Sequence, residues 1–230
     1  MRGTNPIRKQ QLDGTGKLWV QEVFYTLQGE GPFCGYPAVF VRLAGCNLKC
    51  YWCDTAFESS AWEPELSELL GDIESKRPNF CKLIVITGGE PFRQNISPLI
   101  RQLLNSGLAV QIETNGTLWV DLPEHPELTI VCSPKTSTLN NDIVKRNCIY
   151  KYVLAHGQTD PNDGLPIAST QNQTQPCIVA RPPANAQIYV MPLDSFDVHK
   201  NKLNQDECVQ VAQKYGYKMT LQMHKILNIS

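Results

Sequence analysis

The chain has 230 residues, of which 42% are hydrophobic, and its formal net charge is −1 at pH 7. This length suits one α/β domain, because a chain of this size buries roughly 70–75% of its unfolded surface. The near-zero charge excludes an electrostatic attraction to nucleic acid or anionic membranes. No run approaches about 18 apolar residues, and the polar first residues lack the apolar segment of a signal peptide, so we expect a cytoplasmic protein without a membrane span.

Short β-branched and apolar runs alternate with helix-compatible stretches along the chain. Strands are predicted at 18–24, 38–43, 83–87, 108–113, 128–132, 149–154, 187–191 and 217–222. Helices are predicted at 64–76, 96–107 and 204–216, and the last two end on Gly107 and Gly216, as a capping glycine does. This alternation predicts a mainly parallel sheet, whose functional residues lie at the carboxyl ends of the strands.

The domain organisation is simple, because no composition shift divides the chain. Residues 1–17 are predicted to form a flexible N-terminal extension, and residues 18–230 one core domain. The segment 156–185 is rich in Gln, Thr, Asn and Pro and has no clear periodicity. We therefore predict that it is a long polar surface connection that adds little to the core.

Three of the nine cysteines lie close together, in the stretch GCNLKCYWCDT at 45–55. Cys46, Cys50 and Cys53 directly follow the strand predicted at 38–43. Three thiolates can bind three irons of a [4Fe–4S] cluster, and the missing fourth thiolate leaves one iron open to another ligand. A distant fourth cysteine stays open as an alternative. A structural zinc site is disfavoured, because no second Cys or His pair has zinc spacing.

Polar residues also follow the next three predicted strands. VITGGEP (85–91) ends in two glycines and Glu90, which can accept hydrogen bonds from an ammonium group. IETNGT (112–117) supplies Glu113 and Asn115, and CSPK (132–135) supplies Lys135. Each group alone is typical of an ordinary turn. Because the three groups end successive strands, we expect them to form one site.

The three-cysteine pattern, with Trp52 before its last cysteine, resembles the signature of radical S-adenosylmethionine (SAM) enzymes. The resemblance implies an α/β fold, a single-domain open TIM-like β/α barrel, and a SAM molecule that ligates the fourth iron. The reduced cluster of such enzymes cleaves SAM into methionine and a 5′-deoxyadenosyl radical. The SAM contacts implied here are Trp52, Cys53, Asp54, Gly88, Gly89, Glu90, Glu113, Asn115, Ser133, Pro134, Lys135, Met191, Pro192, Leu193 and Asp194.

Three further segments resemble one family of this superfamily, the 7-carboxy-7-deazaguanine synthases. They are EVFYTLQGEG (22–31), FVRLAGCNLKCYWCDT (40–55) and LQMHKILNIS (221–230). That family converts 6-carboxy-5,6,7,8-tetrahydropterin into 7-carboxy-7-deazaguanine and ammonia, with SAM and Mg²⁺, by hydrogen abstraction at C6 and radical ring contraction. The resemblance implies substrate contacts at Leu27, Gln28, Gly29, Glu30, Arg42, Thr87, Gln222, His224 and Ser230. It further implies catalytic roles for the three cysteines and for Thr55 as an Mg²⁺ ligand, a flavodoxin- or ferredoxin-type reductant, and a homodimer.

Two other functions are weighed against this one. A glycyl-radical-enzyme activating protein would share the cluster but act on a protein partner, and the LQGEG and HKILN segments disfavour it. An iron–sulfur electron carrier or redox sensor would need a fourth thiolate, and its spectrum would not respond to SAM. The sequence leaves open whether the product serves tRNA queuosine, a secondary metabolite or DNA.

Overall fold

The computed structural model describes residues 5–12, 16–53, 57–171 and 178–229. One eight-stranded sheet runs in the order β1 to β8. Its strands are β1 (Val20–Leu27), β2 (Pro37–Leu43), β3 (Leu83–Gly88), β4 (Ala109–Thr114), β5 (Leu128–Cys132), β6 (Ile149–Leu154), β7 (Ile188–Pro192) and β8 (Lys218–Met219). Only β1 and β2 pair antiparallel, and all later neighbours are parallel. Since β1 and β8 form the two edges, the sheet is an open β/α barrel, which confirms the predicted fold class.

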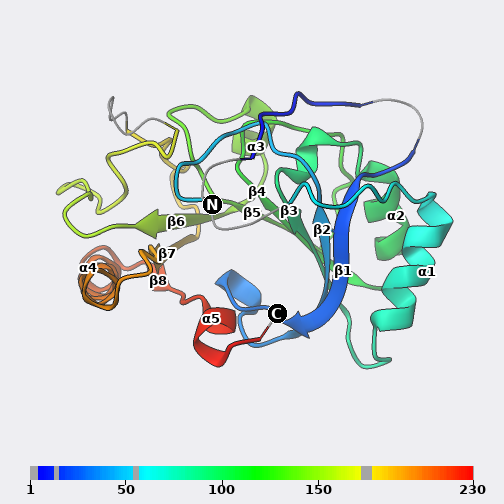
Figure 1. The fold of residues 1–230 in the computed structure, drawn as a ribbon. Helices are drawn as coiled ribbons and strands as arrows, with labels where there is room; N and C mark the ends of the chain where they lie inside the picture. Colours follow the sequence, from blue (N-terminus) through cyan, green and yellow to red (C-terminus); the bar gives the residue numbers. More distant parts are fainter. Residues whose placement is uncertain (1–4, 13–15, 54–56, 172–177, 230) are drawn as a thin grey trace.

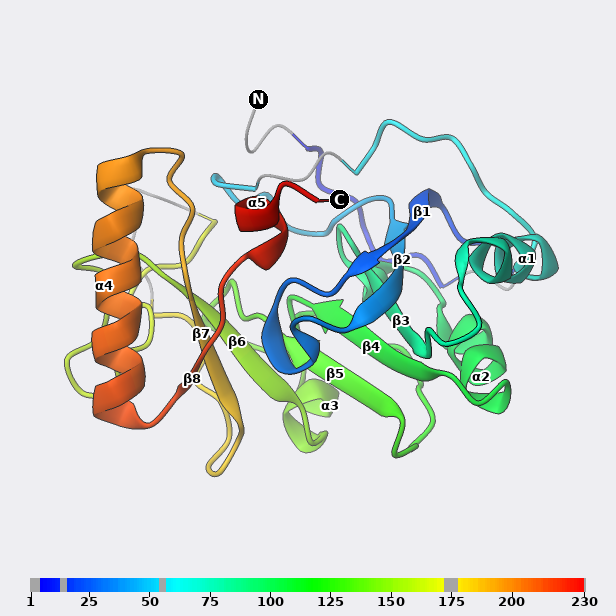
Figure 2. The same ribbon diagram turned by 90° about the horizontal axis from the view of Figure 1, so that it is seen from below.

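Helices lie on both sides of this curved sheet (Figure 1). They are α1 (Leu66–Lys76), α2 (Ser97–Asn105), α3 (Asn141–Lys145), α4 (Val198–Tyr215) and α5 (Met223–Leu227), with short 3₁₀ turns η1 (Gly31–Phe33) and η2 (Pro91–Arg93). Figure 2 shows α1 and α2 beside the β1–β3 end of the sheet and α4 beside β7 and β8. Helix α5 and the η1 loop lie on the concave side, so the chain's last described helix returns to the inside of the barrel.

The core confirms the helical stripe predicted for 96–107. Leu99, Ile100, Leu103 and Leu104 of α2 are all buried, in one hydrophobic cluster with apolar residues on the convex face of β2, β3 and β4. Burying one such side chain contributes about 1.5–3 kcal/mol. This packing fixes α2 on the outside and leaves the concave side free for polar residues.

Several predicted boundaries differ from the structure by a few residues, and α3 and α5 were not predicted; the largest differences are in α4 and β8. Helix α4 begins at Val198, six residues before the predicted start, because the Asp197 side chain accepts a hydrogen bond from the Lys200 amide and caps the helix. Strand β8 contains two residues instead of the six predicted, since the chain turns into α5 soon afterwards. Gly216 ends α4 in the left-handed conformation with φ of 73°, as its position predicted.

Two segments expected at the periphery contact the body of the protein. In the N-terminal segment, the Arg8 amide donates to the Cys46 carbonyl and the Gln11 amide to the Arg93 carbonyl, each at 2.7 Å. Between 156 and 185, Leu165 and Val179 are buried in the main core. The prediction that this segment adds little to the core is therefore wrong for these two positions, because two isolated apolar residues gave no periodic pattern to detect.

In the described part of the chain, no helix combines the length and the apolar character that crossing a bilayer requires.

The α2 packing leads to a test with a matched pair of leucines. Leu103 is 2% exposed in α2, whereas Leu203 in α4 is 45% exposed. We expect Leu103→Ala to lower the free energy of unfolding by about 2–5 kcal/mol, because the truncation leaves a cavity. Leu203→Ala makes the same chemical change at the surface and should cost much less. Urea denaturation measures both, and equal losses would contradict this account of the core.

Candidate active site

The three-cysteine loop leaves β2 at its carboxyl end. Cys46 is 8% exposed, and Cys50 and Cys53 are half-buried. The Leu48 amide donates to Cys46 Sγ at 3.4 Å, and the Cys53 amide donates to the Cys50 carbonyl at 3.2 Å. Burial raises the pKa of Cys46 to about 12, so without a metal this thiol keeps its proton. Metal binding must therefore release that proton.

Cys46, Cys50 and Cys53 fit a cluster of several metal ions, in which each cysteine binds a different ion. Among the described residues, no three His, Cys, Asp or Glu side chains converge on one point as ligands of a single metal ion. A four-iron cluster has a different requirement, because each cysteine binds a different iron. Cys50 Sγ accepts hydrogen bonds from Thr170 Oγ1 and Gln171 Nε2, both at 3.0 Å. Donors to sulfur are typical around such clusters, and sequence reasoning missed both of these residues.

Cys34 and Cys81 are the cysteines nearest to this loop in sequence, and Cys81 lies too far from the loop to be a fourth ligand. It precedes β3, which pairs in parallel with β2 from Ala38↔Leu83 to Leu43↔Gly88. The cluster loop follows Leu43, so Cys81 lies at the opposite end of this strand pair, roughly 15–20 Å away for strands of this length.

Gly88 and Gly89 hold the end of β3 against the cluster loop. The Gly89 amide donates to the Leu43 carbonyl at 3.1 Å, and the Glu90 amide donates to the Gly45 carbonyl at 3.0 Å. A Cβ on Gly89 would collide with the Gly45 carbonyl, and Gly88 has φ of 129°. The glycines were predicted to let a ligand approach the backbone; in the structure they let two segments of the chain itself approach each other.

The Glu90 side chain points into the protein and is bound by groups of the protein itself. Its side chain is 0% exposed and accepts hydrogen bonds from the amides of Phe92 and Asn115 and from Thr114 Oγ1, at 2.7–3.0 Å. In this conformation the Glu90 carboxylate binds groups of the protein itself, and its contact with the SAM ammonium stays a prediction. Burial raises the pKa of Glu90 to about 7, against the opposing effect of its hydrogen bonds. Its role is to join the ends of β3 and β4.

Asn115 joins the end of β4 to the cluster loop. Its Nδ2 donates to Asn47 Oδ1 at 3.0 Å, and its Oδ1 accepts from the Thr117 amide at 2.9 Å. Asn47 in turn donates to Thr117 Oγ1 at 2.8 Å. The strand-end residues therefore position the cysteine loop through side-chain amides.

A small cavity of about 30 Å³ lies beside the cysteine loop. Four predicted SAM residues line it, namely Trp52, Pro134, Lys135 and Leu193. Lys135 Nζ lies 5.2 Å from the centre of the Trp52 ring and donates to Ser133 Oγ. Burial lowers the pKa of Lys135. The cavity thus combines an aromatic face with a cation.

The remaining predicted SAM residues at the end of β7 lie nearby. Pro192, Leu193 and Asp194 line a neighbouring hollow of about 140 Å³, while Met191 is buried within the strand. Asp194 accepts hydrogen bonds from the Phe196 amide, Asn201 Nδ2 and Lys225 Nζ. Leu193 lines both hollows, so the two are adjacent.

A larger cavity of about 270 Å³ gathers the predicted substrate residues. Its lining includes Leu27, Gly29, Glu30, Arg42, Thr87, Gln222 and His224, together with Gly88 and Glu113, which were predicted to contact SAM. Phe24 and Phe40 form an apolar wall, with ring centres 5.2 Å apart and planes inclined by 16°. Phe24 and Phe40 lie opposite each other because of the register between β1 and β2, and the sequence alone does not reveal that register.

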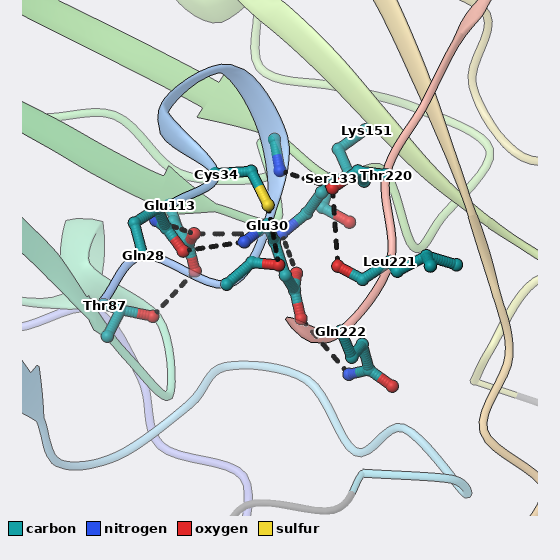
Figure 3. A network of polar contacts seen from close by, with 12 residues as sticks. Gln28, Glu30, Cys34, Thr87, Glu113, Ser133, Lys151, Thr220, Leu221 and Gln222 are labelled. Carbon is teal, nitrogen blue, oxygen red and sulfur yellow. Dashed lines mark hydrogen bonds and ion pairs between the residues drawn. The ribbon is translucent and has the colours of Figure 1, made fainter. Parts of the chain in front are cut away.

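A buried network of charges lies beside this cavity (Figure 3). Lys151 on β6 is paired with Glu30, and its Nζ lies 3.8 Å from Glu113 Oε1. Burial lowers the pKa of Lys151, but the charges of Glu113 and Glu30 outweigh this effect and raise it. Burial likewise raises the pKa of Glu30, and Lys151 reverses that shift, so both groups stay ionised. Sequence reasoning missed Lys151, although a lysine inside the apolar run IYKYVL requires a buried partner.

Neutral side chains complete the network. Gln28 Nε2 donates to Glu113 Oε1 at 3.2 Å, and Gln28 Oε1 accepts from the Glu30 amide at 3.1 Å. Thr87 Oγ1 donates to Glu113 Oε2 at 3.1 Å, and Gln222 Nε2 donates to Glu30 Oε1 at 3.2 Å. Both carboxylates are thus fixed in orientation, and Gln28 acts on them from outside the cavity lining.

Arg42 on β2 is available to a ligand. Its Nε lies 3.3 Å from Glu22 Oε1 as an ion pair, yet this buried nitrogen has no hydrogen-bond partner of good geometry among the described residues. The guanidinium also lies over the Phe24 ring, 5.2 Å from its centre. A planar cation on the wall of a cavity is suited to a carboxylate, which accepts two parallel hydrogen bonds from it.

Asp54, Thr55 and Ser230, which were predicted to contact SAM, Mg²⁺ and the substrate respectively, lie outside the described residues.

Comparisons with known proteins agree with this architecture. Residues 40–129 match the Radical SAM superfamily. The structure of QueE from Escherichia coli superposes with a TM-score of 0.66 and 24% identity, covering 92% of this chain and 96% of that one, which shows a shared fold.

Two relatives match over the whole chain. The 7-carboxy-7-deazaguanine synthase of Rhodospirillum rubrum is 54% identical, with 100% of both chains covered. The 7-carboxy-7-deazaguanine synthase of Rickettsia prowazekii is 36% identical over 100% of this chain and 96% of its own length. With its three-cysteine loop at the carboxyl end of β2, the chain belongs to the 7-carboxy-7-deazaguanine synthase family of radical SAM enzymes.

Proposed function

We propose that this protein converts 6-carboxy-5,6,7,8-tetrahydropterin into 7-carboxy-7-deazaguanine and ammonia, in the biosynthesis of 7-deazaguanines. The observation that carries this proposal is the 270 Å³ cavity, in which an arginine, an apolar wall and two fixed carboxylates face the same space. A carboxylated, flat, nitrogen-rich substrate matches these three features. The strand-end residues that hold the cysteine loop lie next to this cavity, so cofactor and substrate would meet at Gly88.

The cofactor site would consist of the cysteine loop and the neighbouring strand ends. Cys46, Cys50 and Cys53 would hold the [4Fe–4S] cluster, and Trp52, Lys135 and Leu193 would line the space for SAM. When bound, cluster and SAM would supply the radical chemistry that removes a hydrogen atom from the substrate. The chain's own residues orient the two molecules: Glu90 and Asn115 keep the loop against β3 and β4.

The substrate site would be built from the barrel interior. Arg42 would bind the substrate carboxylate through two hydrogen bonds. Glu113 and Glu30 would accept hydrogen bonds from ring N–H and amino groups, since Lys151, Thr87 and Gln28 hold both side chains in place. Phe24 and Phe40 would cover the flat faces of the ring system. Gln222 and His224 would close the cavity from the α5 side.

Further components of this proposal follow from the family resemblance. Thr55 would ligate Mg²⁺ together with substrate oxygens and waters, which suits a hard ion that keeps part of its hydration shell. A flavodoxin- or ferredoxin-type protein would reduce the cluster, and the enzyme would act in the cytoplasm as a homodimer.

The two alternative functions, an electron carrier and a glycyl-radical activating protein, agree less well with the structure. An electron carrier needs a fourth thiolate, which Cys81 at the far end of β3 does not supply. A glycyl-radical activating protein would not need the charged cavity beside its SAM site.

The direct test is turnover by the anaerobically reconstituted protein. With SAM, dithionite, Mg²⁺ and 6-carboxytetrahydropterin, we expect 7-carboxy-7-deazaguanine by mass spectrometry. Cys50→Ala should abolish product, and Cys208→Ala on α4 should retain it. Cleavage of SAM without the deazapurine would reject this substrate, and a four-iron protein that does not cleave SAM would reject the radical enzyme.

Arg42 provides a test of substrate recognition. We expect Arg42→Gln to lower kcat/KM by roughly tenfold to a hundredfold, because hydrogen bonds between charged groups contribute about 1.5–3 kcal/mol. Arg101→Gln removes the same charge from the exposed face of α2 and should leave kcat/KM unchanged. Steady-state kinetics with the carboxylated substrate decide the matter, and equal values for both variants would remove Arg42 from the binding site.

Removal of Mg²⁺ tests the proposed metal. Chelation should lower the rate of product formation, and added Mg²⁺ should restore it. Thr55→Ser retains the hydroxyl and should keep this response, whereas Thr55→Val should weaken it. A rate that is independent of Mg²⁺ would contradict the assignment.

A further inference from the structure

The segment that follows β6 contacts the cysteine loop directly. Thr170 and Gln171 lie near the end of its first described part, 156–171. The Tyr51 amide donates to the Thr170 carbonyl at 3.2 Å, and the Lys49 amide donates to Gln171 Oε1 at 2.9 Å. The two residues on either side of Cys50 are thereby attached to this segment.

The same two residues also donate to the cysteine itself. Thr170 Oγ1 and Gln171 Nε2 each lie 3.0 Å from Cys50 Sγ. The orientation of the Gln171 amide is fixed, because Oε1 must accept from the Lys49 amide and Nε2 must therefore face the sulfur. The second proton of Nε2 goes to Thr170 Oγ1 at 2.8 Å, so Thr170 can direct its own proton to the sulfur.

The position of this donor pair is held by the strand end that lines the SAM cavity. The Lys135 carbonyl accepts from Ser169 Oγ at 2.9 Å and from the Thr170 amide at 3.4 Å. Ser169 Oγ in turn accepts from the Gln171 amide at 3.2 Å. Thr170 is itself buried, so its hydroxyl has little access to water. The segment is therefore hydrogen-bonded both to the residues that follow β5 and to the cysteine loop.

We propose that Thr170 and Gln171 are positioning residues that set the reduction potential of the cluster through two hydrogen bonds to Cys50 Sγ. A sulfur bound to iron carries no proton, so it can only accept these bonds. Donors to a cluster sulfur stabilise the reduced, more negative state and raise the potential. The segment 156–171 thereby contributes to the chemistry of a loop more than a hundred residues earlier in the chain.

This inference rests on the cluster of the proposed function, but it does not depend on the substrate. The cluster potential is measured without a pterin, by redox titration of the reconstituted protein followed by electron paramagnetic resonance. A normal titration without deazapurine formation would reject only the substrate proposed above. A wild-type protein that binds no four-iron cluster would overturn both proposals.

The central comparison uses Thr170→Val, which keeps the shape of the side chain and removes the hydroxyl. We expect its midpoint potential to shift to a more negative value, and the double variant with Gln171→Leu to shift further. One exchangeable-proton coupling to the reduced cluster should also disappear. Thr159→Val is the matched control, because the Thr159 hydroxyl in the same segment donates to Glu207. It should keep the wild-type potential.

Thr170→Ser distinguishes a hydrogen bond from packing. If Thr170→Val assembles less cluster, recovery of both iron content and potential in Thr170→Ser supports the donor role. If Thr170→Ser does not recover them, the role of Thr170 is packing and the inference is wrong. A full cluster with unchanged potential in Thr170→Val would also overturn it.

Discussion

Much of the active-site architecture depends on one buried cation. Lys151 extends from the middle of β6 and is 7% exposed, and an ammonium so far from water stays charged only with carboxylates within reach. Glu30 from the β1–β2 connection and Glu113 from β4 supply them. The interaction therefore draws a loop and two distant strands to one point. It also leaves two oriented carboxyl groups at the wall of the larger cavity, where a polar ligand can use their remaining lone pairs.

The second part of the site depends on close contact between backbones. Gly88 and Gly89 carry no Cβ, so the end of β3 can approach the segment that leads from β2 into the cysteine loop. Glu90 then satisfies two backbone amides and a hydroxyl from its own turn and from β4. A motif that was predicted to bind a ligand thus also fixes the loop that carries Cys46, Cys50 and Cys53. The two roles are compatible, because a loop held at both sides presents its thiols in a reproducible arrangement.

The open barrel explains why these groups can work together. Parallel strands place their carboxyl ends at one edge, and the antiparallel β1–β2 hairpin carries Glu30 back over the concave side. Helix α5 covers the same side with His224 close to Gly29. The long connection after β6 contacts the cysteine loop through Thr170 and Gln171. Cofactor and substrate spaces are consequently bounded by segments from nearly the whole length of the chain.

Local sequence patterns determined the order of the strands, the three longer helices, the three-cysteine loop and the polar strand ends, because periodicity and spacing depend on neighbours in the chain. Leu99 to Leu104 and Gly216 are examples, since helix burial and a left-handed cap are local properties. Family motifs also grouped Arg42, Thr87, Gln222 and His224, which line one cavity. Only the tertiary structure decided that Glu90 is internal, that Lys151 pairs with Glu30, that Phe24 faces Phe40, and that Thr170 and Gln171 reach Cys50. These contacts form between residues that are far apart in the sequence or that are brought together by the register of two strands. Burial and pairing of such residues are properties of the folded chain alone.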